Sequence, residues 1–373
     1  MSIFQLSPLQ KRNRNKIIGI ALFWFLFGMV YAILERGILG ATTVYPSTGN
    51  PYNFSSALLT ASFGALVMGF VFGGIEVFYI NRKFARMAFG VKILLKTSIY
   101  LLAICLLVIL LSFLGSSLSM RVAPNDIAVY NSVILFMSNE AFWCVVFYVA
   151  VAIMVGLFLS EVSDNLGQGV VKNFLFGKYH RPREERRIFM FLDMKASTTI
   201  AEQLGHIRYF ELLNAYYADM TRAILNNAGA VYKYVGDEII VSWDYKTGLK
   251  NNNCLRCFFA IKEAMKSKSE SYKAQFGLAP GFKAGMHCGP VITGEIGVLK
   301  KEIAFNGDVL NTTARIQDLC NDYGVELLVS EDLYTVLTPD NTFVAKPIGN
   351  LSLRGRDARV NLYSVSLQGE AKK

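Results

Sequence analysis

Long apolar runs in the first part of the chain give way to short alternating runs in the second. A helix that crosses a bilayer needs about 20 apolar residues. Four runs in the first 160 residues meet this need, and they are Ile17–Leu34, Ala57–Ile80, Ser98–Ser116 and Ala141–Ser160. A further run, Ile127–Met137, is too short to span and indicates an extracytosolic or re-entrant segment. The pattern predicts a four-helix membrane domain over residues 1–160.

Basic residues gather on one side of these apolar runs. The segments before the first run and after the second contain no acid and hold Lys11, Arg12, Arg14, Lys16, Arg82, Lys83, Arg86, Lys92 and Lys96. The two other loops have only Arg36 and Arg121 as basic residues. Loops rich in lysine and arginine stay in the cytosol. We therefore expect a multi-pass protein of the cell (inner or plasma) membrane, with both termini cytosolic.

The formal net charge of +10 could indicate a nucleic-acid partner. However, the basic residues lie beside the apolar runs, where membrane topology explains them. The sequence therefore predicts a lipid bilayer as a partner and no nucleic acid.

Glu76 is an acidic residue well inside the second apolar run. An ionisable group at such a depth can serve a sensing or ion-binding role. It can also be a carboxylate near the cytosolic end of the span, or a partner in helix packing. The sequence favours the second kind of role and leaves both open.

Residues 161–187 connect the two parts of the chain. Their first half can continue the fourth span as a helix into the cytosol, and Arg181-Pro182 should end it, because proline cannot extend a helix. A basic cluster follows, made of Arg181, Arg183, Arg186 and Arg187. Anionic lipid headgroups could bind it, and a solvated linker is an equal alternative.

The segment from 188 to 368 alternates between strand and helix patterns and predicts a second domain, followed by a short tail at 369–373. The strands expected are Ile188–Leu192, Val231–Val235, Glu238–Trp243, Phe282–Cys288 and Val291–Gly297, the last four as two hairpins. The helices expected are Ser197–Asn226, Asn252–Ser269 and Asp308–Asn321. This order predicts an α+β, ferredoxin-like fold.

Two carboxylates fall at the ends of neighbouring strands. Asp193 follows the first strand, and Asp237 lies in the Gly236-Asp237 turn of the first hairpin. In a split βαβ sheet these positions are adjacent, and Mg²⁺ or Mn²⁺ prefers such oxygen ligands together with phosphates. Taken singly, each could be a solvated turn residue. Taken together, they predict a metal site.

Four motifs in this segment resemble those of class III adenylate/guanylate cyclase catalytic domains. They are RIFMFLDMKASTTIAE, KYVGDEIIVSW, FKAGMHCGPVITGEIG and FNGDVLNTTARIQDL. The resemblance covers residues 187–366. It implies that Asp193 and Asp237, which are 44 residues apart, bind two Mg²⁺ or Mn²⁺ ions per active site, with the Met194 carbonyl nearby.

The resemblance also implies substrate contacts. Asn311 and Arg315 match the pair that positions the ribose and stabilises charge on the α-phosphate, and Asp308 of the same motif is expected to bind substrate. Lys233 matches the residue that contacts adenine. Arg354 falls near a triphosphate-binding lysine of the family.

One position departs from the family pattern. Ala304 stands where adenylate cyclases usually have Asp or Thr, so its side chain cannot accept a hydrogen bond from the adenine amino group. Neighbouring Asn306 or a backbone carbonyl could take this role. The choice between ATP and GTP is therefore not fully specified.

The resemblance implies an adenylate cyclase that converts ATP to 3′,5′-cyclic AMP and pyrophosphate by a two-metal mechanism. In the family, one subunit gives the aspartates and the other gives the remaining groups, which implies a homodimer with two sites. The alternatives are a guanylate or mixed-specificity cyclase, a diguanylate cyclase suggested by Val235-Gly236-Asp237-Glu238, and a membrane receptor with an inactive nucleotide-binding domain.

Overall fold

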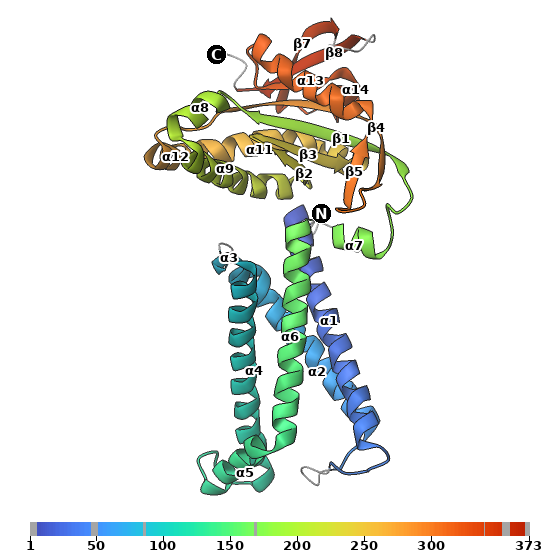
Figure 1. Ribbon diagram of the computed structural model, residues 1–373, viewed down its shortest axis with the longest axis vertical. Helices are drawn as coiled ribbons and strands as arrows, with labels where there is room; N and C mark the ends of the chain where they lie inside the picture. Colours follow the sequence, from blue (N-terminus) through green and yellow to red (C-terminus); the bar gives the residue numbers. More distant parts are fainter. Residues whose placement is uncertain are drawn as a thin grey trace. The chain divides into compact units, whose positions relative to one another are not determined.

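Two compact units make up the structure (Figure 1). The computed structural model describes residues 6–45, 51–84, 87–167, 170–338, 340–352 and 359–369. One unit lies within Lys11–Leu166 and is helical, and the chain from Gly167 onward belongs to the other, which contains both strands and helices.

The helical unit contains the four long apolar helices that the sequence predicts. Its elements are α1 (Pro8–Leu39), α2 (Phe54–Ile75), the π-helical turn η1 (Glu76–Ile80), α3 (Asn81–Lys83), α4 (Phe89–Met120), α5 (Ile127–Ser138) and α6 (Glu140–Leu166). In length and composition α1, α2 with η1, α4 and α6 can each cross a membrane. The short apolar run forms the separate helix α5.

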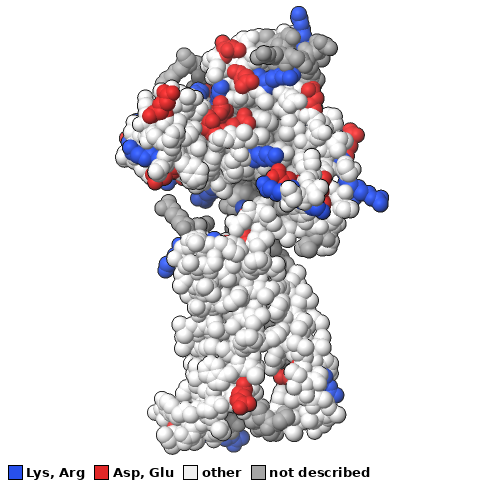
Figure 2. All heavy atoms as spheres, viewed as in Figure 1, with Lys and Arg blue, Asp and Glu red and all other residues white. Residues whose placement is uncertain are grey.

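The outward surface of this unit is apolar. Figure 2 shows its visible face almost entirely white, with few charged side chains. Leu26, Val67 and Leu102, from three different helices, are each more than half exposed. Such a surface suits lipid rather than water.

Small residues bring α1 and α2 together. A Cβ atom at Gly28 would lie 2.5 Å from the Ala61 carbonyl oxygen, and one at Gly69 would lie 2.7 Å from the Ala21 Cα. Small residues permit such close helix contacts where lipid surrounds both helices. Any larger side chain at either glycine would push the two helices apart.

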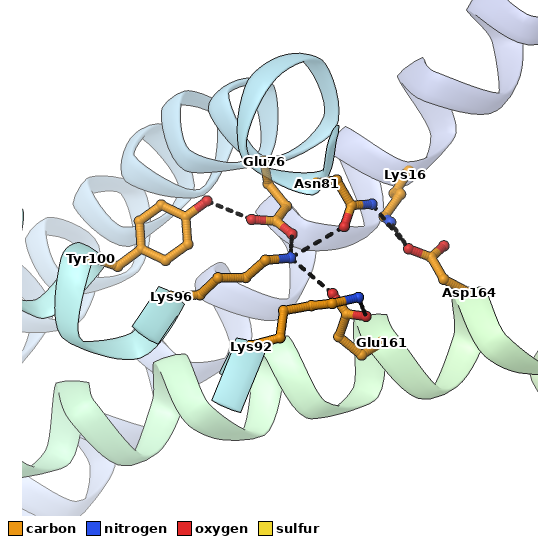
Figure 3. A network of polar contacts seen from close by, with 8 residues as sticks. All are labelled: Lys16, Glu76, Asn81, Lys92, Lys96, Tyr100, Glu161 and Asp164. Carbon is orange, nitrogen blue, oxygen red and sulfur yellow. Dashed lines mark hydrogen bonds and ion pairs between the residues drawn. The ribbon is translucent and has the colours of Figure 1, made fainter. Parts of the chain in front are cut away.

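A polar network joins the helices near one end of the unit (Figure 3). Its centre is Lys96 of α4, which is fully buried. The Lys96 ammonium lies 2.6 Å from a Glu76 carboxylate oxygen and 2.8 Å from one of Glu161. It also donates to the Asn81 side-chain oxygen at 3.1 Å.

Further contacts extend the network to α1 and along α6. Lys92 pairs with the second Glu161 oxygen at 2.7 Å, and Tyr100 donates to Glu76 at 2.6 Å. Asp164 accepts from Asn81 and pairs with Lys16 of α1. Three lysines thus meet three carboxylates, so the network is balanced in charge.

This network decides between the alternatives for Glu76. The carboxylate is 3% exposed and bonded to two side chains of α4, so its role in helix packing is confirmed. It also changes the interpretation of Lys92 and Lys96. The sequence places them in a cytosolic loop, whereas α4 begins at Phe89 and carries both inside the helix bundle.

The second unit contains a mixed sheet with helices on both faces. Its strands are β1 (Arg183–Met194), β2 (Ala230–Val235), β3 (Glu238–Asp244), β4 (Phe282–Ile296), β5 (Glu302–Asn306), β6 (Leu327–Ser330), β7 (Phe343–Ser352) and β8 (Arg359–Leu367). Its helices are α7 (Val170–Leu175), α8 (Ser197–Leu204), α9 (His206–Asn226), α10 (Tyr245–Leu249), the short η2 (Lys250–Asn252), α11 (Asn253–Ser267), α12 (Ser269–Phe276), α13 (Asp308–Asp322) and α14 (Glu331–Tyr334).

The sheet has the order β2-β3-β1-β4-β6-β8-β7, and β5 pairs with β4 outside this path. The first four strands, with their helices, form the predicted ferredoxin-like arrangement, so the expected fold class is confirmed. Alternate residues of β1 face opposite sides. Ile188, Met190 and Leu192 enter a core with α9 and α11, whereas Phe189 and Phe191 pack toward β5 and α13.

Two boundaries predicted from the sequence are wrong. The expected helix Ser197–Asn226 is divided into α8 and α9 at Gly205, whose φ of +74° interrupts the helix. The first strand begins at Arg183 and not at Ile188, because Arg183–Arg187 pair with β4. The basic residues there belong to a strand and not to a linker: Arg187, for example, pairs with Asp244 of β3.

The expected hairpin Phe282–Cys288/Val291–Gly297 is also wrong. These residues form a single strand, β4, which passes through Gly289-Pro290 without turning. The strand stays extended because β1 pairs with it from Phe282 to Thr293. The second half of β4 pairs on its other side with β5.

Candidate active site

Asp193 and Asp237 come together at one end of the sheet. Asp193 is the last residue but one of β1, and Asp237 lies in the turn between β2 and β3. Because β1 pairs with β3 up to Leu192 opposite Ile239, this turn lies beside the end of β1. Burial raises the pKa of Asp193 to about 6, and the adjacent Asp237 carboxylate adds to the increase.

The turn that carries Asp237 is held in place from α9. Gly236 has a φ of +64°, a conformation that glycine adopts without strain. The Tyr217 hydroxyl donates to the Gly236 carbonyl at 2.8 Å. Helix α9 thus fixes the backbone on which Asp237 stands.

Three further side chains surround the aspartates and were not predicted from the sequence. The Lys283 ammonium, on β4, lies 3.6 Å from Asp193, and the Gln317 amide, on α13, donates to the same carboxylate at 3.2 Å. Lys283 is 7% exposed. Glu238 follows Asp237, and burial raises its pKa to about 7, with a further increase from the neighbouring carboxylates.

One sequence signal could have found Lys283. It is a lysine at the start of the segment Phe282–Cys288, which is apolar apart from Lys283 and His287. In the sheet it stands opposite Asp193. The sequence gives no comparable signal for Gln317, which lies within a helix.

The chemistry of this site fits divalent metals. Two carboxylates supply hard oxygen ligands, and their mutual repulsion favours a cation between them. Among the described residues, no group of three or more His, Cys, Asp or Glu side chains forms a closed metal cage. A cation held by two carboxylates still has positions for substrate phosphates and water. Met194, expected to contribute its carbonyl, has a buried side chain.

The two residues expected to contact the base lie in β2 and β5, two strands that are not paired in the sheet. The exposed Lys233 of β2 reaches Glu302 of β5, with 3.5 Å between the ammonium and a carboxylate oxygen. Ala304 is two residues further along β5 and therefore on the same side of the strand as Glu302. Tyr232 also packs on Phe305, with 4.8 Å between ring centres. Lys233 and the Ala304 position are thus brought to one region.

Helix α13 carries Asn311, Arg315 and Asp308. It lies directly on β4, since a Cβ atom at Gly285 would come within 2.4 Å of the Gln317 backbone nitrogen. Asp308 accepts a hydrogen bond from the Thr312 hydroxyl at 3.2 Å. Asn311 is exposed and Arg315 is half-buried.

Within this chain, α13 brings Gln317, but neither Asn311 nor Arg315, to the aspartates. Over the described residues, neither Asn311 nor Arg315 has a hydrogen bond or ion pair to Asp193 or Asp237. Arg354 lies outside the described residues.

Residues 180–366 match the family model of the adenylate and guanylate cyclase catalytic domain. The chain belongs to this family. The cyclase domain therefore occupies half of the protein, and the resemblance drawn from its four motifs is confirmed.

Two proteins named adenylate cyclases are similar to this chain. Adenylate cyclase 2 of Rhizobium meliloti (strain 1021) is 33% identical over 217 residues, which is 57% of this chain and 60% of that protein. The adenylate cyclase of Anabaena cylindrica is 27% identical over 48% of this chain and 36% of its own length. The chain therefore spans less than two thirds of either relative.

A solved structure of a bacterial light-regulated adenylyl cyclase has the same fold. It is 22% identical, covers 57% of this chain and 62% of its own, and superposes with a TM-score of 0.50. At this identity the comparison concerns the fold of the cyclase domain alone.

Proposed function

We propose that this protein is an adenylate cyclase that converts ATP to 3′,5′-cyclic AMP and pyrophosphate. The observation that carries the proposal is the Asp193/Asp237 carboxylate pair, which meets at the end of β1 in a domain of the cyclase family. Two relatives that match this chain are named adenylate cyclases, and they support ATP as the substrate.

Each expected residue has a distinct role in this reaction. Asp193 and Asp237, with the Met194 carbonyl, would hold two Mg²⁺ or Mn²⁺ ions. When bound, such ions lower the barrier to attack of the ribose 3′-hydroxyl on the α-phosphate. Asn311 orients the ribose. Arg315 donates hydrogen bonds to the α-phosphate, where its fixed positive charge stabilises the charge that develops.

Further residues bind the rest of the nucleotide. Lys233 contacts the adenine ring, and Asp308 and Arg354 complete the substrate site. Ala304 offers no side-chain acceptor to the adenine amino group. Glu302 provides one two residues earlier on the same face of β5, within reach of Lys233. Adenine can use such a pair, because its N1 accepts a hydrogen bond from a lysine and its amino group donates one to a carboxylate.

The active site is shared between two copies of the chain. The Asp193/Asp237 pair and the Asn311/Arg315 pair both occur in this chain, yet they have no contact within it over the described residues. A head-to-tail homodimer would bring one pair from each chain together and form two equivalent sites.

The four apolar helices hold the cyclase in the cell (inner or plasma) membrane, with both termini in the cytosol. The distribution of lysine and arginine supports this orientation. A membrane-impermeant maleimide should label Thr42→Cys in intact cells and Ser7→Cys only after permeabilisation, in a background without Cys105 and Cys144. Labelling of Ser7→Cys in intact cells would reverse the orientation.

Product analysis tests the proposed reaction. Purified full-length protein is incubated with ATP or GTP, each with Mg²⁺ or Mn²⁺, and the products are identified by mass spectrometry. We expect cyclic AMP from ATP, its loss in Asp237→Asn, and a lower preference for ATP in Glu302→Ala than in Lys301→Ala, which changes an exposed neighbour. A cyclic dinucleotide, cyclic GMP as the main product, or no product at all would refute the proposal.

A further inference from the structure

A cavity lies among the helices of the helical unit. Its volume is about 480 Å³, within the range of small-molecule sites. Residues from α1, α2, α4, α5 and α6 line it, so it is a space within the bundle and not a groove on one helix. Most of the lining is apolar, with side chains such as Ile104, Val108 and Val146.

One carboxylate faces this apolar lining. Glu35 of α1 accepts a hydrogen bond from Tyr31 at 2.9 Å, and the Tyr45 side chain interacts with the same group. All three residues line the cavity. The aromatic ring of Phe142 adds a further wall.

Glu35 differs from the carboxylates in the polar network of Figure 3. Each carboxylate there has a lysine partner, and the charges cancel. Among the described residues, Glu35 has no ion pair within the lining or elsewhere in the helical unit. Arg36 is adjacent in sequence, but it is exposed and points about 100° away around the helix.

An apolar space with one uncompensated carboxylate favours a particular class of ligand. A protonated amine would neutralise Glu35, and the Tyr31, Tyr45 and Phe142 rings would attract its positive charge. An apolar body attached to that amine would fill the remainder of the cavity. An anion would be repelled, and a neutral alcohol would leave the carboxylate charge unbalanced.

We propose that the helical unit binds a small amphiphilic amine in this cavity, with the ammonium group at Glu35. The site would make the helical unit a receptor as well as an anchor. The proposal stands on the helical unit alone and does not depend on the reaction that the cyclase domain catalyses.

Equilibrium binding of radiolabelled n-octylamine to full-length protein in lipid nanodiscs tests the proposal, with empty nanodiscs subtracted. We expect saturable binding of one molecule per chain. Unlabelled n-octylamine should compete, whereas octanoate and n-octanol should compete far less. A hydrogen bond to a charged group contributes about 1.5–3 kcal/mol, so Glu35→Gln should weaken binding about tenfold or more.

Two other variants test whether binding needs the cavity itself and whether it responds to the loss of any acidic residue. Val108→Phe keeps Glu35 but fills the cavity, and it should also abolish saturable binding. Glu140→Gln removes an acid that does not line the cavity and should leave binding unchanged. Absence of saturable binding to the wild-type protein, equal binding by Glu35→Gln, or equal competition by octanoate would overturn the proposal.

Discussion

The groups around Asp193 have opposite effects on its pKa. Burial and the Asp237 carboxylate raise its pKa, while Lys283 acts to lower it. Lys283 is almost fully buried and 3.6 Å from the Asp193 carboxylate. Its ammonium thus supplies part of the positive charge that a metal would supply. A metal ion bound by Asp193 and Asp237 has to tolerate this neighbouring positive charge.

Replacing Lys283 with Met should therefore strengthen metal binding. A unit charge and a divalent ion about 6 Å apart repel by roughly 5–6 kcal/mol at an effective dielectric of about 20, and solvent screening reduces this to about 1 kcal/mol or more. We expect the Kd for Mn²⁺, measured by calorimetry on the full-length protein, to fall several-fold. Lys195→Met is the control, because Lys195 is more exposed and pairs with Glu326. A Kd that is unchanged or higher in Lys283→Met would show that its charge does not oppose the metal.

Helix α13 is the element that places Asn311 and Arg315 over the sheet. It rests on β4 at Gly285, where a Cβ atom would come within 2.8 Å of the Gln317 Cα and the Thr313 carbonyl oxygen. These contacts are with backbone atoms, so no side-chain rotation relieves them. The height of α13 above the sheet is therefore set by the absence of a side chain at this position.

Gly285→Ala should displace α13. Overpacking of this kind destabilises a protein by about 1–3 kcal/mol. We expect a lower unfolding temperature and a reduced kcat, since Asn311 and Arg315 move with the helix. Gly281→Ala is the matched control, because its new Cβ would meet only the flexible Lys195 side chain at 3.4 Å. Wild-type kcat and stability in Gly285→Ala would contradict the packing described.

In the helical unit, the packing of the helices depends on Lys96. Its ammonium joins Glu76 of η1 to Glu161 of α6, and all three groups are buried. Removal of one partner from a buried ion pair leaves a charge without compensation. The network therefore holds the end of α6, after which the chain continues to the cyclase domain.

Lys96→Met should destabilise the helical unit by about 3–5 kcal/mol. Thermal unfolding of the full-length protein in detergent measures this loss. The double variant Lys96→Met/Glu76→Gln removes one charge of each sign, and it should recover part of the stability. If the single variant were as stable as the wild type, the network would not hold these helices together.

The sequence predicts those elements whose signal is local. The four apolar helices follow from their length, and the turn at Asp237 follows from its Gly-Asp pair. Features that depend on distant partners were missed. Gly289-Pro290 looks like a turn, but β1 keeps β4 extended there. The sequence places Lys96 in a loop, but it lies inside the bundle, where it pairs with carboxylates of two other helices.

The same distinction applies to the candidate site. Asp193 and Asp237 could be paired from the sequence, because strand ends in a split βαβ sheet are adjacent. The contacts of Lys283 and Gln317 with Asp193 could not be predicted from the sequence, since they arise from the register of β4 and the placement of α13. Register and helix placement are set by packing over the whole domain.

At the scale of the whole molecule, the proposed active site needs two chains. The aspartate pair lies at the end of β1, whereas Asn311 and Arg315 of α13 have no hydrogen bond or ion pair to it among the described residues; α13 reaches the pair through Gln317 instead. The proposed homodimer would join them and form two sites. Each variant chain that lacks one pair still carries the other pair intact.

Co-expression of Asp237→Ala chains with Asn311→Ala chains tests this arrangement most directly. A dimer of one chain of each kind has one site with both defects and one intact site. We predict that each variant alone forms almost no cyclic AMP, and that the co-expressed pair recovers up to half of the wild-type activity per heterodimer. Absence of recovery, with heterodimers demonstrated by two affinity tags, would contradict an active site shared between two chains.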